Sequence, residues 1–288
     1  MTQTTSSQPS RIVIVGASLA GASAAIALRD QGYQGELTLI GEESQLPYER
    51  PPLSKAVLLG NTDEPDWVGD EATYADKDIS LRLGTIATRI DRSRKVVVAS
   101  RTEYPYDKLL IATGSAPRRL DVPGADLEGL LTLRTLEESL ALRERFTEGA
   151  AIVIVGAGWI GCEAAAAARE HGAKVTVIEP RSQPLLPVVG EQVGATFAAL
   201  HRDHGVDLRL GIGVTGFAGD GVVSSVHIKG HASVPADTVL IGVGAAPNIA
   251  LADAAGLSLP RAASQSTQHC AALIRHLRRG RRRGRRSS

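Results

Sequence analysis

Residues 11–42 and residues 151–179 carry one sequence pattern twice, at a separation of 140 positions. Twelve of the 22 residues between positions 11 and 32 are identical to their counterparts in the second copy. Each copy runs from an apolar stretch through a glycine-rich turn into an alanine-rich segment, and then into a second apolar stretch that ends in an acid. Short continuous apolar stretches are typical of buried parallel strands. Each copy therefore predicts a βαβ unit, and the chain should fold as an α/β protein.

The glycine-rich turns occupy residues 16–21 and 156–161, with a glycine at both ends of each. In a dinucleotide-binding turn, the first glycine allows the bend, the middle one lets a pyrophosphate approach, and the last lets the helix pack closely. Helix N–H groups and the helix dipole then face the phosphates. Two such motifs predict two Rossmann-like dinucleotide-binding domains, rather than two structural units with incidental glycines. The middle place holds Gly158 in the second copy but Ser18 in the first, which makes the first site less typical.

An acid after the second strand of each copy is placed to accept hydrogen bonds from a ribose 2′-hydroxyl. Glu179 fits that role in the second copy, and Glu42 fits it in the first, with Glu43 as its nearest competitor. The negative charge of Glu179 favours NAD over NADP, while Arg181 two residues later is the opposing feature.

Composition excludes several classes of protein. No apolar run is long enough to span a bilayer, and residues 1–10 lack the basic and apolar regions of a secretory signal. The two cysteines, Cys162 and Cys270, give neither a disulfide framework nor metal-ligand spacing, so we expect no metal site and a cytoplasmic protein. We expect Cys162 and its neighbour Trp159 to be packing residues.

The net charge of +1 conceals two unlike parts. Residues 261–288 contain nine arginines and no acid, so the 23 basic and 31 acidic residues before them give that part a charge of −8. A basic arm of this kind can bind the phosphates of nucleic acid or of a membrane. The alternative is out-of-frame translation of GC-rich DNA, which the abrupt change in composition favours. The acidic body also opposes nucleic-acid binding, so we expect neither nucleic acid nor a membrane as a partner.

Along the rest of the chain, the apolar patterns predict further elements and a domain order. Strands are expected at 80–83, 95–99, 106–114, 206–229 and 238–244, and helices at 136–148 and 191–204. Prolines and glycines near residues 117–124 predict a domain boundary. The expected order is a disordered 1–10, a first nucleotide domain at 11–115 rejoined by 247–260, a second at 116–246, and a disordered or out-of-frame tail at 261–288.

The segment Tyr-Glu-Arg-Pro-Pro-Leu-Ser-Lys at residues 48–55 is the most discriminating part of the sequence. Together with both glycine turns, Ala-Thr-Gly at 112–114, Leu-Arg-Thr-Leu at 133–136 and residues 242–248, it resembles the FAD-dependent NADH:ferredoxin reductases of the putidaredoxin reductase and rubredoxin reductase type. The resemblance covers residues 11 to about 259. The related disulfide reductases carry a cysteine pair after the first βαβ unit, and this chain has no cysteine before Cys162.

The resemblance implies roles by position. Lys55 would lie beside the isoalloxazine ring and Glu163 near the nicotinamide, as the two residues closest to the chemistry. The residues implied to bind FAD are Gly16, Ser18, Ala20, Gly21, Glu42, Arg50, Lys55, Ala87, Thr113, Gly114 and Arg134. Those implied to bind NADH are Gly156, Gly158, Ile160, Gly161, Glu179 and Gly244.

The implied chemistry is hydride transfer from NADH to the flavin, followed by electron transfer to a [2Fe-2S] ferredoxin or a rubredoxin-type acceptor. Two alternatives remain open: an NADH oxidase or nitrite reductase on the same scaffold, and a non-catalytic remnant that binds NADH at most. Plain structural roles also remain for single residues. Lys55 could be a solvated lysine, Arg50 and Arg134 surface charges, and Glu163 a first-turn acid that complements the helix dipole.

The family also implies a third segment, with an Asp that contacts the flavin ribityl chain, and a C-terminal domain. Neither pattern occurs after residue 259, where the arginine-rich tail begins. We therefore expect that a frameshift has removed the C-terminal domain, and that the chain as written retains FAD weakly.

Overall fold

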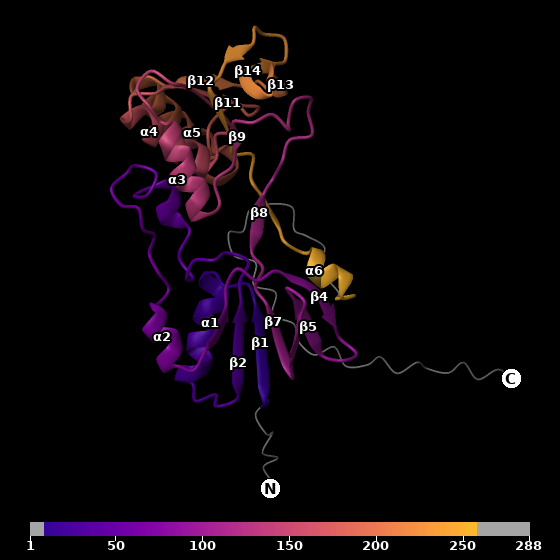
Figure 1. Ribbon diagram of the computed structural model, residues 1–288. Coiled ribbons are helices and arrows are strands. Elements are labelled where there is room, and N and C mark those ends of the chain that lie inside the picture. The colour runs from indigo at the N-terminus through magenta and orange to yellow at the C-terminus, as the bar shows by residue number, and fades with distance from the viewer. Residues whose placement is uncertain (1–8, 258–288) are drawn as a thin grey trace, which may run out of the picture.

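The computed structural model describes residues 9–257, which form two α/β units stacked end to end (Figure 1). The first unit is built on a four-stranded sheet in which every pairing is parallel. Its strands, in sheet order, are β3 (Ser80–Arg82), β2 (Glu36–Ile40), β1 (Arg11–Val15) and β7 (Lys108–Ile111). Helix α1 (Leu19–Asp30) connects β1 to β2, and the short helix α2 (Glu71–Asp76) precedes β3.

The second unit repeats this design with a five-stranded parallel sheet. Its strands, in sheet order, are β12 (Asp207–Leu210), β11 (Lys174–Glu179), β10 (Ala151–Val155), β16 (Thr238–Ile241) and β9 (Leu130–Leu131). Its helices are α3 (Leu136–Arg145), α4 (Trp159–Glu170) and α5 (Leu186–Asp203).

The internal repeat extends well beyond the glycine turns. In both units an antiparallel three-stranded sheet comes between the third and fourth parallel strands of the repeat. These sheets comprise β4 (Ala87–Asp91), β5 (Val96–Ala99) and β6 (Thr102–Pro105) in the first unit, and β13 (Val214–Asp220), β14 (Val222–Ile228) and β15 (Val234–Pro235) in the second. Each packs its apolar side chains on one face of its parallel sheet, whereas helices cover the other face.

The chain passes between the units twice, through two antiparallel strands. Strand β8 (Ser115–Pro117) leaves the first unit, and β17 (Ala245–Pro247) returns to it beside β8. The short helix α6 (Ala250–Ala254) then packs on the first unit, where Ala252 joins Ile90 and Val97 in the core (Figure 1).

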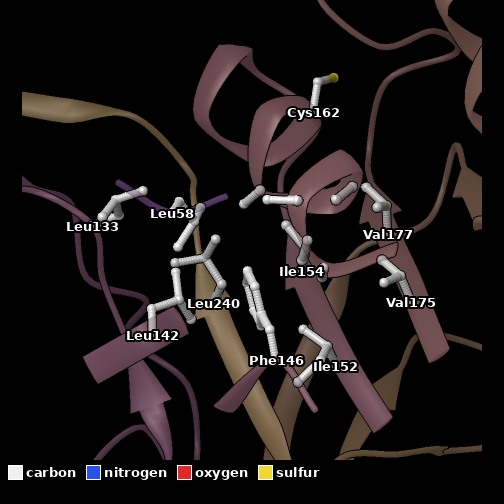
Figure 2. Packing of buried hydrophobic residues seen from close by; sticks show 14 of the residues in the cluster. Leu58, Leu133, Leu142, Phe146, Ile152, Ile154, Cys162, Val175, Val177 and Leu240 are labelled. Atoms are coloured by element: carbon white, nitrogen blue, oxygen red, sulfur yellow. The ribbon is translucent and has the colours of Figure 1, made fainter. Parts of the chain in front are cut away.

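A segment of the first unit lies in the core of the second. We call residues 48–59, which include the 3-10 helix η1 (Pro51–Ser54), the strap. Two prolines begin η1, where their fixed φ suits a helical first turn and no N–H is lost from a hydrogen bond. Leu53, Val57 and Leu58 of the strap are fully buried among side chains of α3, α4 and the second sheet. Figure 2 shows Leu58 beside Leu142 and Leu240 in this cluster.

The predicted α/β architecture with two βαβ units is confirmed, and so are strands at all five predicted regions. The helix predicted at 191–204 is the regular part of α5, because Gly190 interrupts its first turn with φ 76°. The predictions for residues 1–8 and 258–288 lie outside the described part of the chain.

Candidate functional site

The two glycine turns have the same local structure, at the carboxyl ends of β1 and β10. Gly16 and Gly156 adopt φ angles of 113° and 104°, in a region that favours glycine. A Cβ on either would collide with a backbone carbonyl of the neighbouring strand's end, Ala112 O and Gly242 O respectively. These glycines are therefore required by the fold itself.

The last glycine of each turn allows the helix to approach the strand. A Cβ on Gly21 would collide with the carbonyl oxygen of Gly16, and a Cβ on Gly161 with that of Gly156. Both residues are buried within the first turn of their helices.

The middle position of the second turn differs, because no described residue occupies the space beside it. Gly158 has an ordinary φ of −78°, and a Cβ there would meet no heavy atom of the described chain within 4 Å. Ser18 is equally extended, with φ −117°, and its side chain makes no capping hydrogen bond. The fold therefore accommodates serine in the first turn, and the open space beside Gly158 in the second turn is where a phosphate would lie.

The helix ends beyond both turns suit an anion. Neither α1 nor α4 has an acidic residue in its first turn, so the positive end of each helix dipole is not offset by a neighbouring carboxylate. Ala20 and Ile160 are exposed in these first turns. The helix dipoles suit a phosphate at both turns, and the open space beside Gly158 adds room for one at the second.

The ribose-binding acids predicted for the two copies have different surroundings. Glu179 is 4% exposed; its Oε2 accepts the Ala157 N–H at 2.8 Å, and its Oε1 accepts the Arg181 N–H at 3.0 Å. Its carboxylate is thus fixed against the glycine turn. Glu42 is exposed just after β2 and makes no hydrogen bond or ion pair with any described residue.

Glu43, the competitor of Glu42, is occupied elsewhere. Arg50 donates to both of its carboxylate oxygens, and the Tyr48 hydroxyl donates to Oε2. Burial opposes ionisation of Glu43, but these hydrogen bonds outweigh it and hold its pKa below the ordinary value. Glu42 is consequently the acid left free to face a ribose.

Arg50 and Arg134, predicted to share the flavin site, lie together. Arg50 Nη1 donates to the Arg134 carbonyl at 2.8 Å, while its Nε is buried without a partner among the described residues. Burial, followed by the charge of Arg50, lowers the pKa of Arg134. A Cβ on Gly114 would lie 3.5 Å from Arg134 Nη2, so this guanidinium faces the turn that follows β7. Glu43 already pairs with Arg50, so Arg134 is the one of these two cations that makes no ion pair with the described residues and can attract an anionic ligand group.

Reciprocal hydrogen bonds between Thr113 and Asn248 join the two chain segments that connect the units, next to β8 and β17. The Thr113 hydroxyl donates to the Asn248 carbonyl at 2.8 Å, and the Asn248 side-chain amide donates to the Thr113 carbonyl at 2.9 Å. Gly114 accepts the Asn248 N–H at 2.9 Å. Gly244, with φ 100°, lies at the corresponding turn of the second unit.

Ala87, also predicted to contact the flavin, is half-buried at the start of β4 and packs on the first unit's core.

Lys55 and Glu163 meet across the junction between the units. Lys55 Nζ lies 2.9 Å from Glu163 Oε1, and the side chains are 55% and 25% exposed. Lys55 follows η1 in the strap, whereas Glu163 lies in the second turn of α4. The Ser54 hydroxyl donates to Glu163 Oε2. The sequence analysis assigned no role to Ser54 or Tyr48. Both lie within the discriminating segment at residues 48–55, which was the only sequence feature that could have indicated a role for them.

Cys162 is a buried residue of α4 and carries no disulfide. Burial, aided by the charges of Glu163 and Glu179, raises the pKa of its thiol to about 12. A thiol that stays protonated at neutral pH is a packing group, as predicted, and not a nucleophile. Trp159, by contrast, is 40% exposed although its ring meets that of Phe197 edge to face, so it packs less fully than predicted.

Within residues 9–257, no three acidic, histidine or cysteine side chains are gathered as a metal ion would require. The helices of the same part of the chain lack the length and apolar content of a bilayer crossing.

Comparison with known proteins gives concordant matches. Residues 10–274 match the family model described as pyridine nucleotide-disulphide oxidoreductase. The ferredoxin–NAD(+) reductase subunit of the benzene 1,2-dioxygenase system of Pseudomonas putida is 40% identical over 251 residues, covering 87% of this chain and 61% of the relative. Rhodocoxin reductase of Rhodococcus erythropolis is 41% identical, covering 85% and 58%.

Solved structures agree with the sequence matches. The reductase in the covalent putidaredoxin reductase–putidaredoxin complex superposes with a TM-score of 0.84 at 37% identity, over 87% of this chain and 62% of that one. The chain thus spans about three fifths of the length of these relatives.

Proposed function

Because the chain belongs to the pyridine nucleotide-disulphide oxidoreductase family, we propose that it is a FAD-dependent oxidoreductase that takes electrons from NADH and delivers them to a ferredoxin-type iron–sulfur protein. The observation that carries this proposal is the pair of alike glycine turns, whose first and last glycines meet the same steric limits, with open space beside Gly158 and the Lys55–Glu163 ion pair at the junction of their units. The names of the relatives, which are ferredoxin and rubredoxin reductases, support the choice of acceptor.

In the proposal, the first unit holds FAD. The turn at residues 16–21 and the end of α1 bind its pyrophosphate, and Glu42 binds its ribose. Arg50, Ala87, Thr113, Gly114 and Arg134 surround its flavin portion. The flavin supplies the capacity to accept a hydride and release single electrons. Arg134 provides positive charge where an anionic cofactor approaches, while Arg50 is paired with Glu43.

The second unit holds NADH in the same proposal. The turn at residues 156–161 binds the pyrophosphate, with Ile160 and Gly244 alongside, and Glu179 binds the ribose. A carboxylate at that place disfavours a 2′-phosphate, so NADH is the expected donor rather than NADPH. Lys55 places a positive charge at the junction, and Glu163 orients it.

The test is the visible spectrum and activity of the purified full-length chain. Because FAD retention is expected to be weak, FAD is added; bound flavin should then give its absorbance bands, and with NADH as donor the protein should reduce first ferricyanide and then a purified [2Fe-2S] ferredoxin. NADH binding without flavin would support the non-catalytic alternative. Oxidation of NADH by oxygen alone, with no transfer to ferredoxin or rubredoxin, would overturn the proposed acceptor class.

A further inference from the structure

Ser54 and Lys55 are adjacent residues that hold the two oxygens of one carboxylate. The Ser54 hydroxyl donates to Glu163 Oε2, and the Lys55 ammonium lies 2.9 Å from Oε1. Ser54 is 8% exposed, whereas the Lys55 side chain is 55% exposed. The buried Ser54 side chain therefore has little freedom to move away from Glu163, whereas the exposed Lys55 side chain can change its conformation.

The backbone on each side of this contact is rigid. Ser54 is the last residue of η1, which begins with two prolines, and the Lys55 N–H donates to the Pro52 carbonyl at 3.0 Å. Glu163 lies on α4, whose helix is anchored by buried alanines. What remains free is the terminal torsion of the Glu163 side chain, which has no sharp intrinsic preference. An exposed lysine on a four-carbon chain does not restrict that torsion well.

We propose that Ser54 is a positioning residue: its hydroxyl fixes the orientation of the Glu163 carboxylate, and through it the place of the Lys55 ammonium at the junction. This inference rests on the proposed function, in which Lys55 lies beside the flavin. It adds to that function a side chain that touches neither nucleotide.

Ser139 provides a matched control. It is fully buried in α3, and its hydroxyl donates to the Leu53 carbonyl at 2.6 Å, across the same junction and to the same short helix. Ser139→Ala removes a serine hydroxyl bond between the units and leaves Glu163 untouched. Any general loosening of the junction should appear in this variant as well.

The experiment measures the rate at which acetic anhydride acetylates Lys55, by peptide mass spectrometry, in the folded full-length protein without added cofactor. An ammonium held by a carboxylate reacts more slowly than a free one. Ser54→Ala and Glu163→Ala should each speed acetylation of Lys55 roughly two- to fivefold, the size that a partly exposed ion pair allows. The double variant should be no faster than Glu163→Ala alone. Ser139→Ala should match the wild type, and Ser54→Thr, which keeps the hydroxyl, should stay slow.

An unchanged Lys55 rate in Ser54→Ala would overturn the inference, as would equal acceleration in Ser139→Ala. Additive effects in the double variant would overturn it too, because Ser54 would then act without Glu163. Circular dichroism verifies that each variant is folded, and Ser54→Gly, which also removes the hydroxyl, replaces Ser54→Ala if that variant does not fold. Failure of the protein to bind flavin would count against the proposed function but would leave this measurement valid, since it needs no cofactor.

Discussion

The three glycines of the second turn meet different physical demands, and substitutions at Gly158 and Gly161 separate them. A methyl group at Gly158 enters open space, whereas one at Gly161 collides with the Gly156 carbonyl. Gly158→Ala should therefore leave the free energy of unfolding within about 0.5 kcal/mol of wild type. It should weaken NADH binding about tenfold or more, because the methyl group fills the phosphate's place.

Gly161→Ala should instead lower the free energy of unfolding by about 1–3 kcal/mol, the usual cost of overpacking. Urea denaturation and NADH titration by fluorescence distinguish the two variants. Wild-type NADH affinity in Gly158→Ala would show that the NADH phosphates do not lie beside residue 158.

His201 on α5 makes the stability of the second unit depend on pH. It is 8% exposed, and burial, with a smaller contribution from the charge of His204, lowers its pKa below the ordinary 6.5. The unfolded chain therefore binds this proton more readily than the folded one. The contribution of neutral His201 to the free energy of unfolding is therefore complete above about pH 6.5, the pKa in the unfolded chain. It is lost as the pH falls toward the lower pKa of the folded protein.

His201→Gln should flatten the fall in unfolding free energy between pH 7.5 and 5.5, by at most about 1.4 kcal/mol per pH unit for one proton. His227→Gln, at an exposed position on β14, is the control and should keep the wild-type slope. Denaturant titrations at several pH values give the comparison. Parallel slopes for His201→Gln and wild type would contradict the assignment.

At the scale of elements, the start of α3 depends on a residue from the other unit. Thr135 and Glu138 form a capping box, and the Leu136 N–H donates to the Tyr48 hydroxyl at 2.9 Å. The same hydroxyl accepts from Arg50 Nη1 at 2.6 Å and donates to Glu43. Tyr48 therefore satisfies a helix N–H that the capping box leaves open.

Tyr48→Phe should lower the free energy of unfolding by about 1–3 kcal/mol, because it leaves buried polar groups without a partner. Tyr106→Phe is the matched control, since its buried ring carries a hydroxyl with no hydrogen bond to the described chain. Chemical denaturation should show the second variant close to wild type. Equal losses in both would mean that the Tyr48 hydroxyl contributes nothing specific.

The elements also show what sequence patterns can and cannot predict. The strands β1 and β10 are continuous apolar runs that pair on both sides, so their pattern alone identifies them. Strands β8, β9 and β17 have two or three residues each. These segments are too short for an apolar pattern to identify, and they are strands only through their hydrogen-bonded pairing with other segments. The pairing of Lys55 with Glu163, 108 positions apart, depends on how the strap packs on α4 and leaves no local signal in the sequence.

At the scale of the whole molecule, the strap couples the two units. Leu58 is fully buried in the second unit's core although its chain belongs to the first. Leu58→Ala should lower the free energy of unfolding by about 2–5 kcal/mol through the lost packing and the cavity that remains. Because the strap contributes to that core, calorimetry should show both units losing stability together.

Leu200→Ala, at a 51% exposed position on α5, should change the unfolding free energy by less than about 0.5 kcal/mol. A calorimetric trace of Leu58→Ala in which one transition moves and another stays fixed would show that the units unfold independently.

The antiparallel pairing of β8 with β17 places the two ends of the second unit side by side, with Pro117 opposite Ala245. A folded body whose ends emerge together can be inserted into a host chain, or cut from it, without displacing the host's strands. The second unit is thus a cassette within the first. Deleting the second unit and joining β8 to β17 by a short turn would expose the apolar side chains of the strap, because they pack in the core of the deleted unit. The shortened protein would therefore need polar replacements at Leu53, Val57 and Leu58 to remain soluble.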